Sequence, residues 1–220
     1  MSEITQNISQ FKASLSEKVT LVAVSKTKPN EDIEEAYAAG QRVFGENKIQ
    51  EMTDKWEALP KDIQWHMIGH VQTNKVKYMA PYVSLIHSAD RLKLFKEINK
   101  EAKKNDRIID VLLQVKIAEE DSKFGMSPEN AKEFLEHNAA NNYPNVRVVG
   151  LMGMASFVDD ETQISREFSQ LEKIYNTFKD TYGFKVLSMG MSGDYPIALK
   201  HGSTMVRVGS AIFGARNYDN

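Results

Sequence analysis

The sequence predicts an α/β protein: a single (β/α)8 barrel of the TIM type with an extra N-terminal helix, spanning residues 1–220. Short apolar runs rich in β-branched residues alternate with amphipathic segments, as in a parallel sheet whose strands are joined by helices. Eight such repeats in about 200 residues fit a closed barrel. An open doubly wound sheet is the alternative, but no GxGxxG or GxxxxGK[ST] motif follows a predicted strand.

Each predicted element follows from local spacing. The N-terminal helix is expected around residues 4–15. Ser127 and Pro128 are typical of an N-cap and a first helical position. Phe168, Leu171 and Phe178 recur at helical spacing along a later segment. The predicted strands are residues 20–25, 43–45, 64–68, 84–87, 110–116, 146–151, 185–188 and 205–208.

The composition is that of an ordinary globular protein, with 41% hydrophobic and 26% charged residues and a net charge of −2. This balance argues against a nucleic-acid partner or an acidic membrane surface. No apolar run approaches the roughly 18 residues needed to span a bilayer. The absence of cysteine excludes disulfides, thiolate metal sites and a cysteine nucleophile. Because the N-terminus is polar and carries acids, it resembles neither a secretory signal nor a transit peptide, and we expect a cytoplasmic protein. We also expect a monomer.

The active site of such a barrel lies at the carboxyl ends of its strands. Lys26 follows the first predicted strand, in "LVAVSKTKP". A lysine there can simply mark the emergence of the chain into solvent. In a barrel it is instead an amine at the mouth of the site, placed to attack a carbonyl carbon.

The second, third and sixth strand ends supply further candidates. Asn47 lies in "VFGENK", where it could also cap the next helix. His66 and His70 are four residues apart but at a strand end, so they would not share a helical face and we expect no metal site. Met152 lies among small residues in "GLMGMA", which suits the close approach of a flat ligand, but a methionine there can equally be a core residue. We expect Asn47, His66 and Met152 to contact the ligand.

The last two strand ends suit a phosphate. "SMGMSGD" is not a GxSxG elbow, and its Ser192–Gly193 turn offers a hydroxyl and a backbone N–H. Gly209 and Ser210 begin a short helix after the eighth strand, in the usual phosphate-binding region of such barrels. Arg207 precedes them and could also be a barrel-wall arginine paired with an acid. A lysine facing a phosphate site suits pyridoxal 5′-phosphate (PLP), an aldehyde-bearing phosphorylated ring.

Six segments, in order along nearly the whole chain, resemble the motifs of the YggS/PROSC family of PLP-binding proteins. They are "VAVSKTKP", "VFGENKIQE", "WHMIGHVQTNKVK", "GLMGMA", "MGMSGDYPIAL" and "GSTMVRVGSAIFG". The resemblance implies the barrel of the alanine racemase N-terminal domain, with Lys26 as the Schiff-base lysine. It also implies phosphate contacts from Ser192, Gly209 and Ser210, and Arg207 facing the pyridine nitrogen. A guanidinium there keeps that nitrogen unprotonated and the cofactor a weak electron sink.

The resemblance implies a role in PLP homeostasis: holding, buffering or delivering the vitamer, with apo forms of PLP-dependent enzymes as recipients. The racemases add a second domain and a tyrosine base from a partner subunit, for which the sequence gives no source. A PLP-dependent racemase or decarboxylase with an unidentified base is the first alternative. A phosphate-binding barrel enzyme without PLP is the second.

Lys123 is a candidate for PLP transfer. It lies in "EEDSKFG", in the loop after the fifth predicted strand, on the expected face of Lys26. Among neighbouring acids it can equally be a solvated loop residue. As a second amine at the rim it could accept the aldehyde as PLP leaves Lys26.

Overall fold

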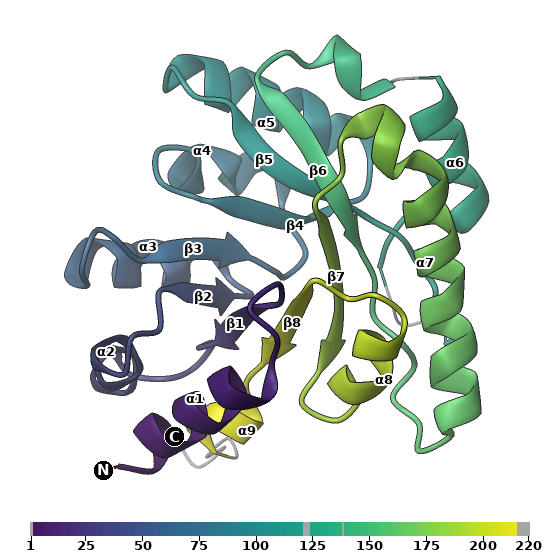
Figure 1. The fold of residues 1–220 in the computed structure, drawn as a ribbon. Coiled ribbons are helices and arrows are strands. Elements are labelled where there is room, and N and C mark those ends of the chain that lie inside the picture. Colours follow the sequence, from purple (N-terminus) through teal and green to yellow (C-terminus); the bar gives the residue numbers. More distant parts are fainter. Residues whose placement is uncertain (1, 121–123, 138, 215–220) are drawn as a thin grey trace.

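The computed structural model describes residues 2–120, 124–137 and 139–214, which contain a closed barrel of eight parallel strands in sequence order (Figure 1). The last strand pairs with the first, with Val22 beside Arg207, and this pairing closes the barrel. The (β/α)8 prediction is therefore confirmed. The strands are β1 (Thr20–Val24), β2 (Val43–Glu46), β3 (Gln64–Met67), β4 (Leu85–Ala89), β5 (Ile109–Gln114), β6 (Val146–Met152), β7 (Val186–Met191) and β8 (Met205–Val208).

Every predicted strand is present, and the largest differences lie at three carboxyl ends. β5 ends at Gln114, before the predicted end at residue 116, and two strands extend beyond theirs. β4 continues to Ala89 and β7 to Met191, beyond the predicted ends at residues 87 and 188. In both strands the pairing register shifts near the end, between Ile86 and Ala89 in β4 and between Ser188 and Met191 in β7. Such irregularities extend a strand past the point at which its apolar alternation stops.

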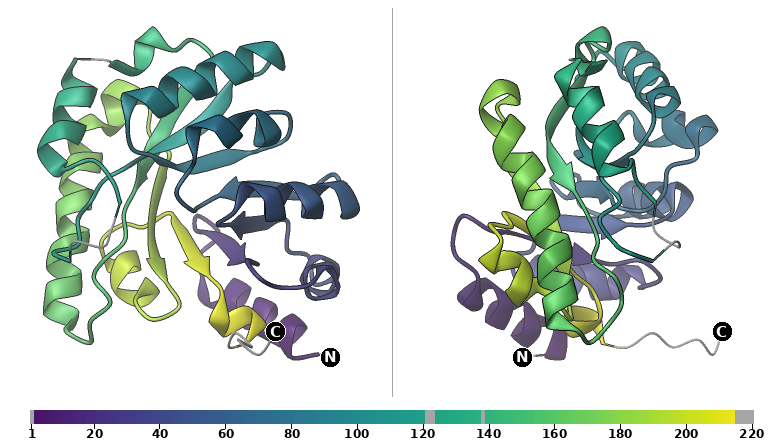
Figure 2. Two further views of the ribbon diagram at one scale, coloured as in Figure 1. Left: turned by 180° about the vertical axis from the view of Figure 1, so that it is seen from behind. Right: turned by 90° about the vertical axis from the view of Figure 1, so that its right-hand side faces the viewer.

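Helices cover the outside of the barrel, as the two views of Figure 2 show. The longest, α7, is capped by the Asp160 side chain and ends at Gly183, which has a left-handed backbone. The helices are α1 (Glu3–Ser14), α2 (Asn30–Ala38), α3 (Ile49–Ala58), α4 (Val76–Met79), α5 (Leu92–Lys104), α6 (Pro128–Glu136), α7 (Glu161–Tyr182), α8 (Tyr195–Lys200) and α9 (Ser210–Phe213), with short 3-10 turns η1 (Thr73–Lys75) and η2 (Ala139–Asn142).

The extra N-terminal helix α1 packs beside α9, at the other end of the described chain (Figure 1). Ile8 of α1 is fully buried, and the Asn7 side chain donates a hydrogen bond to the Ile212 carbonyl at 3.0 Å. The first helix thus supports the segment that follows β8.

Two apolar regions stabilise the barrel. The larger fills the space between the strands and the helices, where Phe44, Trp65 and Phe168 are fully buried. The smaller lies within the barrel and consists of Val22, Leu85, Leu112, Met152 and Met205. Since alternate residues of a strand face the same side, the inward positions two residues further along β4 and β8 are His87 and Arg207. The interior therefore changes from apolar to polar toward the carboxyl ends.

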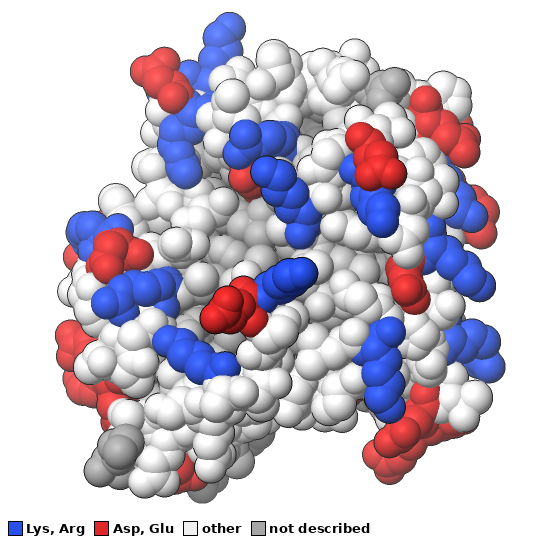
Figure 3. All heavy atoms as spheres, in the orientation of Figure 1, with Lys and Arg blue, Asp and Glu red and all other residues white. Residues whose placement is uncertain are grey.

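Charged side chains of both signs are interspersed on the face shown in Figure 3. Of the helices in the described ranges, not one combines the length and apolar character that crossing a bilayer demands.

Candidate functional site

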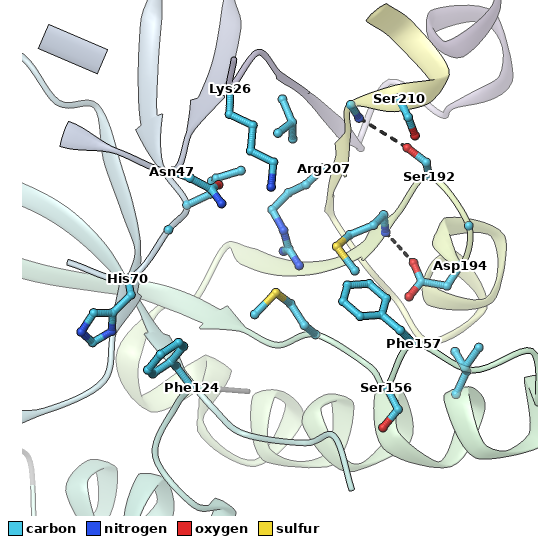
Figure 4. A pocket seen from close by; sticks show the side chains of 18 of the residues that line it. Lys26, Asn47, His70, Phe124, Ser156, Phe157, Ser192, Asp194, Arg207 and Ser210 are labelled. Atoms are coloured by element: carbon cyan, nitrogen blue, oxygen red, sulfur yellow. Dashed lines mark hydrogen bonds between the residues drawn. The ribbon is translucent and has the colours of Figure 1, made fainter. Parts of the chain in front are cut away.

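A cavity of about 750 Å³ lies where the strands of the barrel end (Figure 4). Its lining comes from the loops after most of the strands, so residues far apart in the sequence meet there. Seven residues singled out from the sequence are among those lining it: Lys26, Asn47, Ser192, Gly193, Arg207, Gly209 and Ser210. Their part in binding a cofactor remains a prediction.

Two lysines from the loop after β1 line this cavity. The Lys26 side chain extends into it, toward Arg207 (Figure 4). Lys28 instead directs its Nζ to the Phe213 carbonyl at 2.7 Å, at the end of α9. Lys26 is thus the better placed amine for a ligand in the centre of the cavity.

Hydrogen bonds hold the backbone on both sides of Lys26. The Ser25 hydroxyl is inaccessible to solvent and donates to Glu46 Oε1 at 2.6 Å. The Thr27 amide donates to Glu51 Oε1 at 2.5 Å. Thr27 itself has φ of 63°, in the left-handed region that β-branched residues rarely adopt. The surrounding contacts must therefore maintain this conformation.

The two glutamates belong to a cluster centred on the buried Lys55 of α3. The Lys55 ammonium donates to the Ser25 carbonyl, to Glu46 Oε1 and to Glu51 Oε1, each at 2.8 Å. Burial raises the pKa of Glu46, and the charge and hydrogen bond of Lys55 partly offset that effect. The cluster thus ties the Lys26 turn to β2 and α3.

Asn47 reaches the cavity from the end of β2. It does not cap the following helix, because α3 begins at Ile49 with Lys48 as its N-cap residue. A Cβ atom at Gly69 would lie 2.3 Å from the Asn47 carbonyl oxygen, so only glycine allows the loop after β3 to pass this closely.

The opposite side of the cavity is formed by the turns after β7 and β8. The Gly209 amide donates to the Ser192 hydroxyl at 3.4 Å, which joins the two turns (Figure 4). The Asp194 carboxylate accepts a 2.5 Å hydrogen bond from the Met191 amide and braces the first turn. Hydroxyl and backbone N–H groups therefore gather here, as a phosphate site requires.

Arg207 projects into the cavity from β8 and is only 4% exposed. Its Nη1 donates to the Ser188 hydroxyl and its Nη2 to the Gly153 carbonyl at 3.1 Å. Burial lowers the pKa of Arg207 to about 10, which leaves it charged at neutral pH. None of the described ion pairs includes Arg207, but the negative charge of Asp194 partly offsets the effect of burial on its pKa.

His66 and Met152 are not among the residues that line the cavity, and their contact with a ligand stays a prediction. Met152 belongs to the apolar layer inside the barrel, and the cavity is lined by Met154, two residues further along. His66 is buried below the cavity, where its Nδ1 lies 3.0 Å from His87 Nε2. Both residues belong to the strands themselves, whereas most of the lining comes from the loops that follow the strands.

Several lining residues were not predicted from the sequence as ligand contacts. His70 stacks on Phe124 with ring centroids 4.6 Å apart, and Phe157, which is 72% exposed, lies on the other side of the cavity near Asp194 (Figure 4). They lie in loops, where periodicity gives no signal. His87 does not line the cavity, but it shares its strand face with Leu85, and this spacing places it in the barrel interior. Lys123 lies outside the described residues.

The donors present fit an anionic ring compound with a reactive carbonyl. An amine, a turn rich in N–H and hydroxyl groups, and a buried guanidinium surround a cavity large enough for a small cofactor. Within the described ranges, no three His, Asp or Glu side chains are grouped as metal ligands would be.

The family model for the alanine racemase N-terminal domain matches residues 1–217. A protein of Aquifex aeolicus named pyridoxal phosphate homeostasis protein is 43% identical over 201 residues, covering 90% of this chain and 87% of that protein. The protein of the same name from Escherichia coli is 36% identical and covers 99% of both chains.

Two solved structures are also similar to this chain. PipY of Synechococcus elongatus, determined with PLP bound, has a TM-score of 0.86 at 32% identity and covers 96% of this chain and all of its own. An alanine racemase of Clostridium difficile has a TM-score of 0.78 at 13% identity, and the match covers 58% of that longer chain. The second likeness concerns the fold alone.

Proposed function

This chain belongs to the family of pyridoxal phosphate homeostasis proteins built on the alanine racemase N-terminal domain, and from that membership we propose that it binds PLP and acts in PLP homeostasis. The observation that carries the proposal is the cavity itself: the Lys26 amine extends into a space bounded by the joined turns of Ser192 and Gly209. PLP carries an aldehyde and a phosphate at two ends of one ring.

In this proposal Lys26 provides the amine to which the cofactor's aldehyde carbon is attached, with loss of water. Ser192, Gly193, Gly209 and Ser210 hold the phosphate through hydroxyl and backbone N–H groups. When bound, the cofactor supplies a carbonyl that amines attack reversibly. The buried cluster of Glu46 and Lys55 keeps the Lys26 turn in place.

Arg207 faces the pyridine nitrogen in this proposal. Arginine offers only N–H donors, and it stays charged even with a lowered pKa. A donor opposite the ring nitrogen disfavours its protonation, and an unprotonated ring withdraws electrons weakly. Such a site suits holding and releasing PLP better than catalysis on amino acids.

We accordingly propose a non-catalytic, cytoplasmic carrier that acts as a monomer and passes PLP to apo-enzymes. Its relatives are named as homeostasis proteins. In the transfer step Lys123 would act as a second amine, as the sequence predicts.

Reconstitution with PLP followed by borohydride reduction tests the proposal. We expect a visible absorbance band on PLP addition, and peptide mass analysis should find the reduced adduct on Lys26. Lys26→Ala should abolish band and adduct without unfolding the protein. Lys28→Ala is the matched control, because Lys28 lines the same cavity but is committed to the Phe213 carbonyl, and the adduct should remain on Lys26.

A lack of any PLP absorbance in the wild type would overturn the binding proposal, and an adduct mainly on another lysine would overturn the Lys26 assignment. The carrier role is tested by incubating the loaded protein with amino acids and, separately, with an apo-transaminase. We expect activation of the transaminase, and racemisation or decarboxylation no faster than with free PLP.

A further inference from the structure

A row of polar side chains crosses the interior of the barrel beneath the cavity. His66 of β3, His87 of β4, Ser188 of β7 and Arg207 of β8 are each at most 4% exposed. His66 Nδ1 lies 3.0 Å from His87 Nε2, and His87 Nδ1 lies 3.1 Å from Ser188 Oγ. Arg207 Nη1 donates to the same hydroxyl. The row therefore links the cavity to the opposite wall of the barrel.

The direction of the hydrogen bonds in this row follows from Arg207. A guanidinium has no acceptor, so the Ser188 oxygen must accept from it. The Ser188 proton then needs an acceptor, and the described contacts of this hydroxyl offer only His87 Nδ1. His87 must carry its own proton on Nε2 and donate it to His66 Nδ1, which puts the His66 proton on Nε2 as well.

The reverse direction is disfavoured. It would place two donors, from Arg207 and His87, on the Ser188 oxygen and leave the hydroxyl proton without an acceptor among the described contacts. A buried donor without a partner is costly because water cannot replace the missing bond. Both rings are neutral in either case, since burial lowers the pKa of His66 to about 3 and the pKa of His87 well below its usual value.

We infer that Ser188, His87 and His66 are positioning residues for Arg207. All hydrogen bonds of this chain run in the same direction, from Arg207 to His66, and both histidines carry their proton on Nε2. Arginine side chains are long, and several rotatable bonds must be fixed for the guanidinium to hold one place. Ser188 and the Gly153 carbonyl provide that fixation. The Ser188 oxygen stays directed to Arg207 because the Ser188 hydroxyl donates its hydrogen bond to His87 Nδ1.

The consequence at the cofactor rests on the proposed function, whereas the chain itself does not. If Arg207 faces the ring of PLP, any added mobility of the guanidinium weakens its contact with the ligand. Removing the Ser188 hydroxyl should then weaken PLP binding although Ser188 is not among the residues lining the cavity.

The first experiment reads the tautomers in the protein without ligand. Long-range ¹H–¹⁵N correlation spectra distinguish a ring protonated on Nε2 from one protonated on Nδ1. At neutral pH we expect the Nε2–H form for both His66 and His87. An Nδ1–H signature at His87 would overturn the proposed direction. This measurement requires neither PLP binding nor a variant.

The second experiment is a double-mutant cycle on PLP affinity. Ser188→Ala should weaken PLP binding by about tenfold, the equivalent of one hydrogen bond of ordinary net strength. In an Arg207→Met background the same change should have less than about a twofold effect, because the residue through which Ser188 acts is gone. Equal effects in both backgrounds would overturn the positioning role.

Ser165→Ala is the matched control. Its hydroxyl also pairs with a histidine, since Ser165 Oγ lies 2.7 Å from His201 Nε2, but this pair joins the outer helix α7 to the residue that follows α8. It should leave PLP affinity unchanged. If the wild type bound no PLP, the proposed function would be refuted. The direction of the hydrogen-bond chain would still be tested by the tautomers of His66 and His87, which are measured without PLP.

Discussion

Gly209 joins two turns of the candidate site through its backbone. Its amide donates to the Ser192 hydroxyl, and it is the N-cap residue of α9. A Cβ atom there would meet Val24 Cβ and the Val24 carbonyl oxygen at 3.3 Å, so even alanine would require β1 to give way. Absence of a side chain is therefore the property that this position needs.

Gly209→Val should weaken PLP binding by at least about tenfold, because its branched side chain displaces the amide from Ser192. Ser210→Ala, which leaves the backbone in place, should cost less than about threefold. PLP titration followed by absorbance measures both, and thermal unfolding of the apo-proteins checks that Gly209→Val still folds. Equal losses, or a larger loss at Ser210, would contradict a phosphate site made chiefly by backbone.

At this scale the sequence predicts which strand ends meet, but not how deep each side chain lies. Lys26, Asn47 and Ser192 follow their strands directly and reach the cavity. His66 and Met152 are inward-facing residues of the strands themselves, and their depth depends on the stagger between neighbours. No pattern within one strand carries that information.

The β1–α2 connection is the element most dependent on buried charge. Ser25 and Thr27 are both tied to the Glu46–Glu51–Lys55 cluster, and Glu46 Oε2 has no hydrogen-bond partner among the described residues. A buried carboxylate in this position is tolerated only while Lys55 compensates its charge. The cluster escapes sequence reasoning because it joins β2, which holds Glu46, to α3, which holds Glu51 and Lys55.

Lys55→Met should lower the free energy of unfolding by about 3–5 kcal/mol near neutral pH, since it leaves the Glu46 charge unpaired. The loss should shrink toward low pH. Burial already raises the pKa of Glu46 in the folded state, and without Lys55 it rises further. At a pH above the ordinary carboxyl pKa of about 4.5, Glu46 ionises more readily in the unfolded chain than in the folded one. The variant therefore loses stability as pH increases.

Urea unfolding at about pH 5 and about pH 8 measures this slope. Lys55→Met combined with Glu46→Gln should recover most of the loss and flatten the pH dependence. Lys100→Met is the control: Lys100 also pairs with two glutamates but is 55% exposed, so the expected cost is at most about 1 kcal/mol. If the loss of unfolding free energy in Lys55→Met did not change with pH, altered packing rather than the unpaired Glu46 charge would explain it.

At the scale of the whole molecule, the alternation of apolar runs and helices predicts the closed barrel, because eight parallel strands can pair in a ring without a free edge strand. What it does not predict is how the first helix takes part. Phe11 of α1 contacts the Tyr195 ring of α8 edge-on, at 5.5 Å between centroids, and Asn7 bonds to Ile212 of α9. The N-terminal helix therefore supports the two short helices behind Ser192 and Gly209.

Ile8→Ala tests whether this support concerns stability alone. Ile8 is fully buried, so truncation should lower the free energy of unfolding by about 2–5 kcal/mol. PLP affinity of the folded protein should change less than about twofold, because the Asn7 and Phe11 contacts still hold α8 and α9. Ile108→Ala, at a position 57% exposed, should change stability by no more than about 0.5 kcal/mol. A fall in affinity that parallels the fall in stability would mean that α1 governs the phosphate turns directly, since the site would then loosen whenever the first helix does.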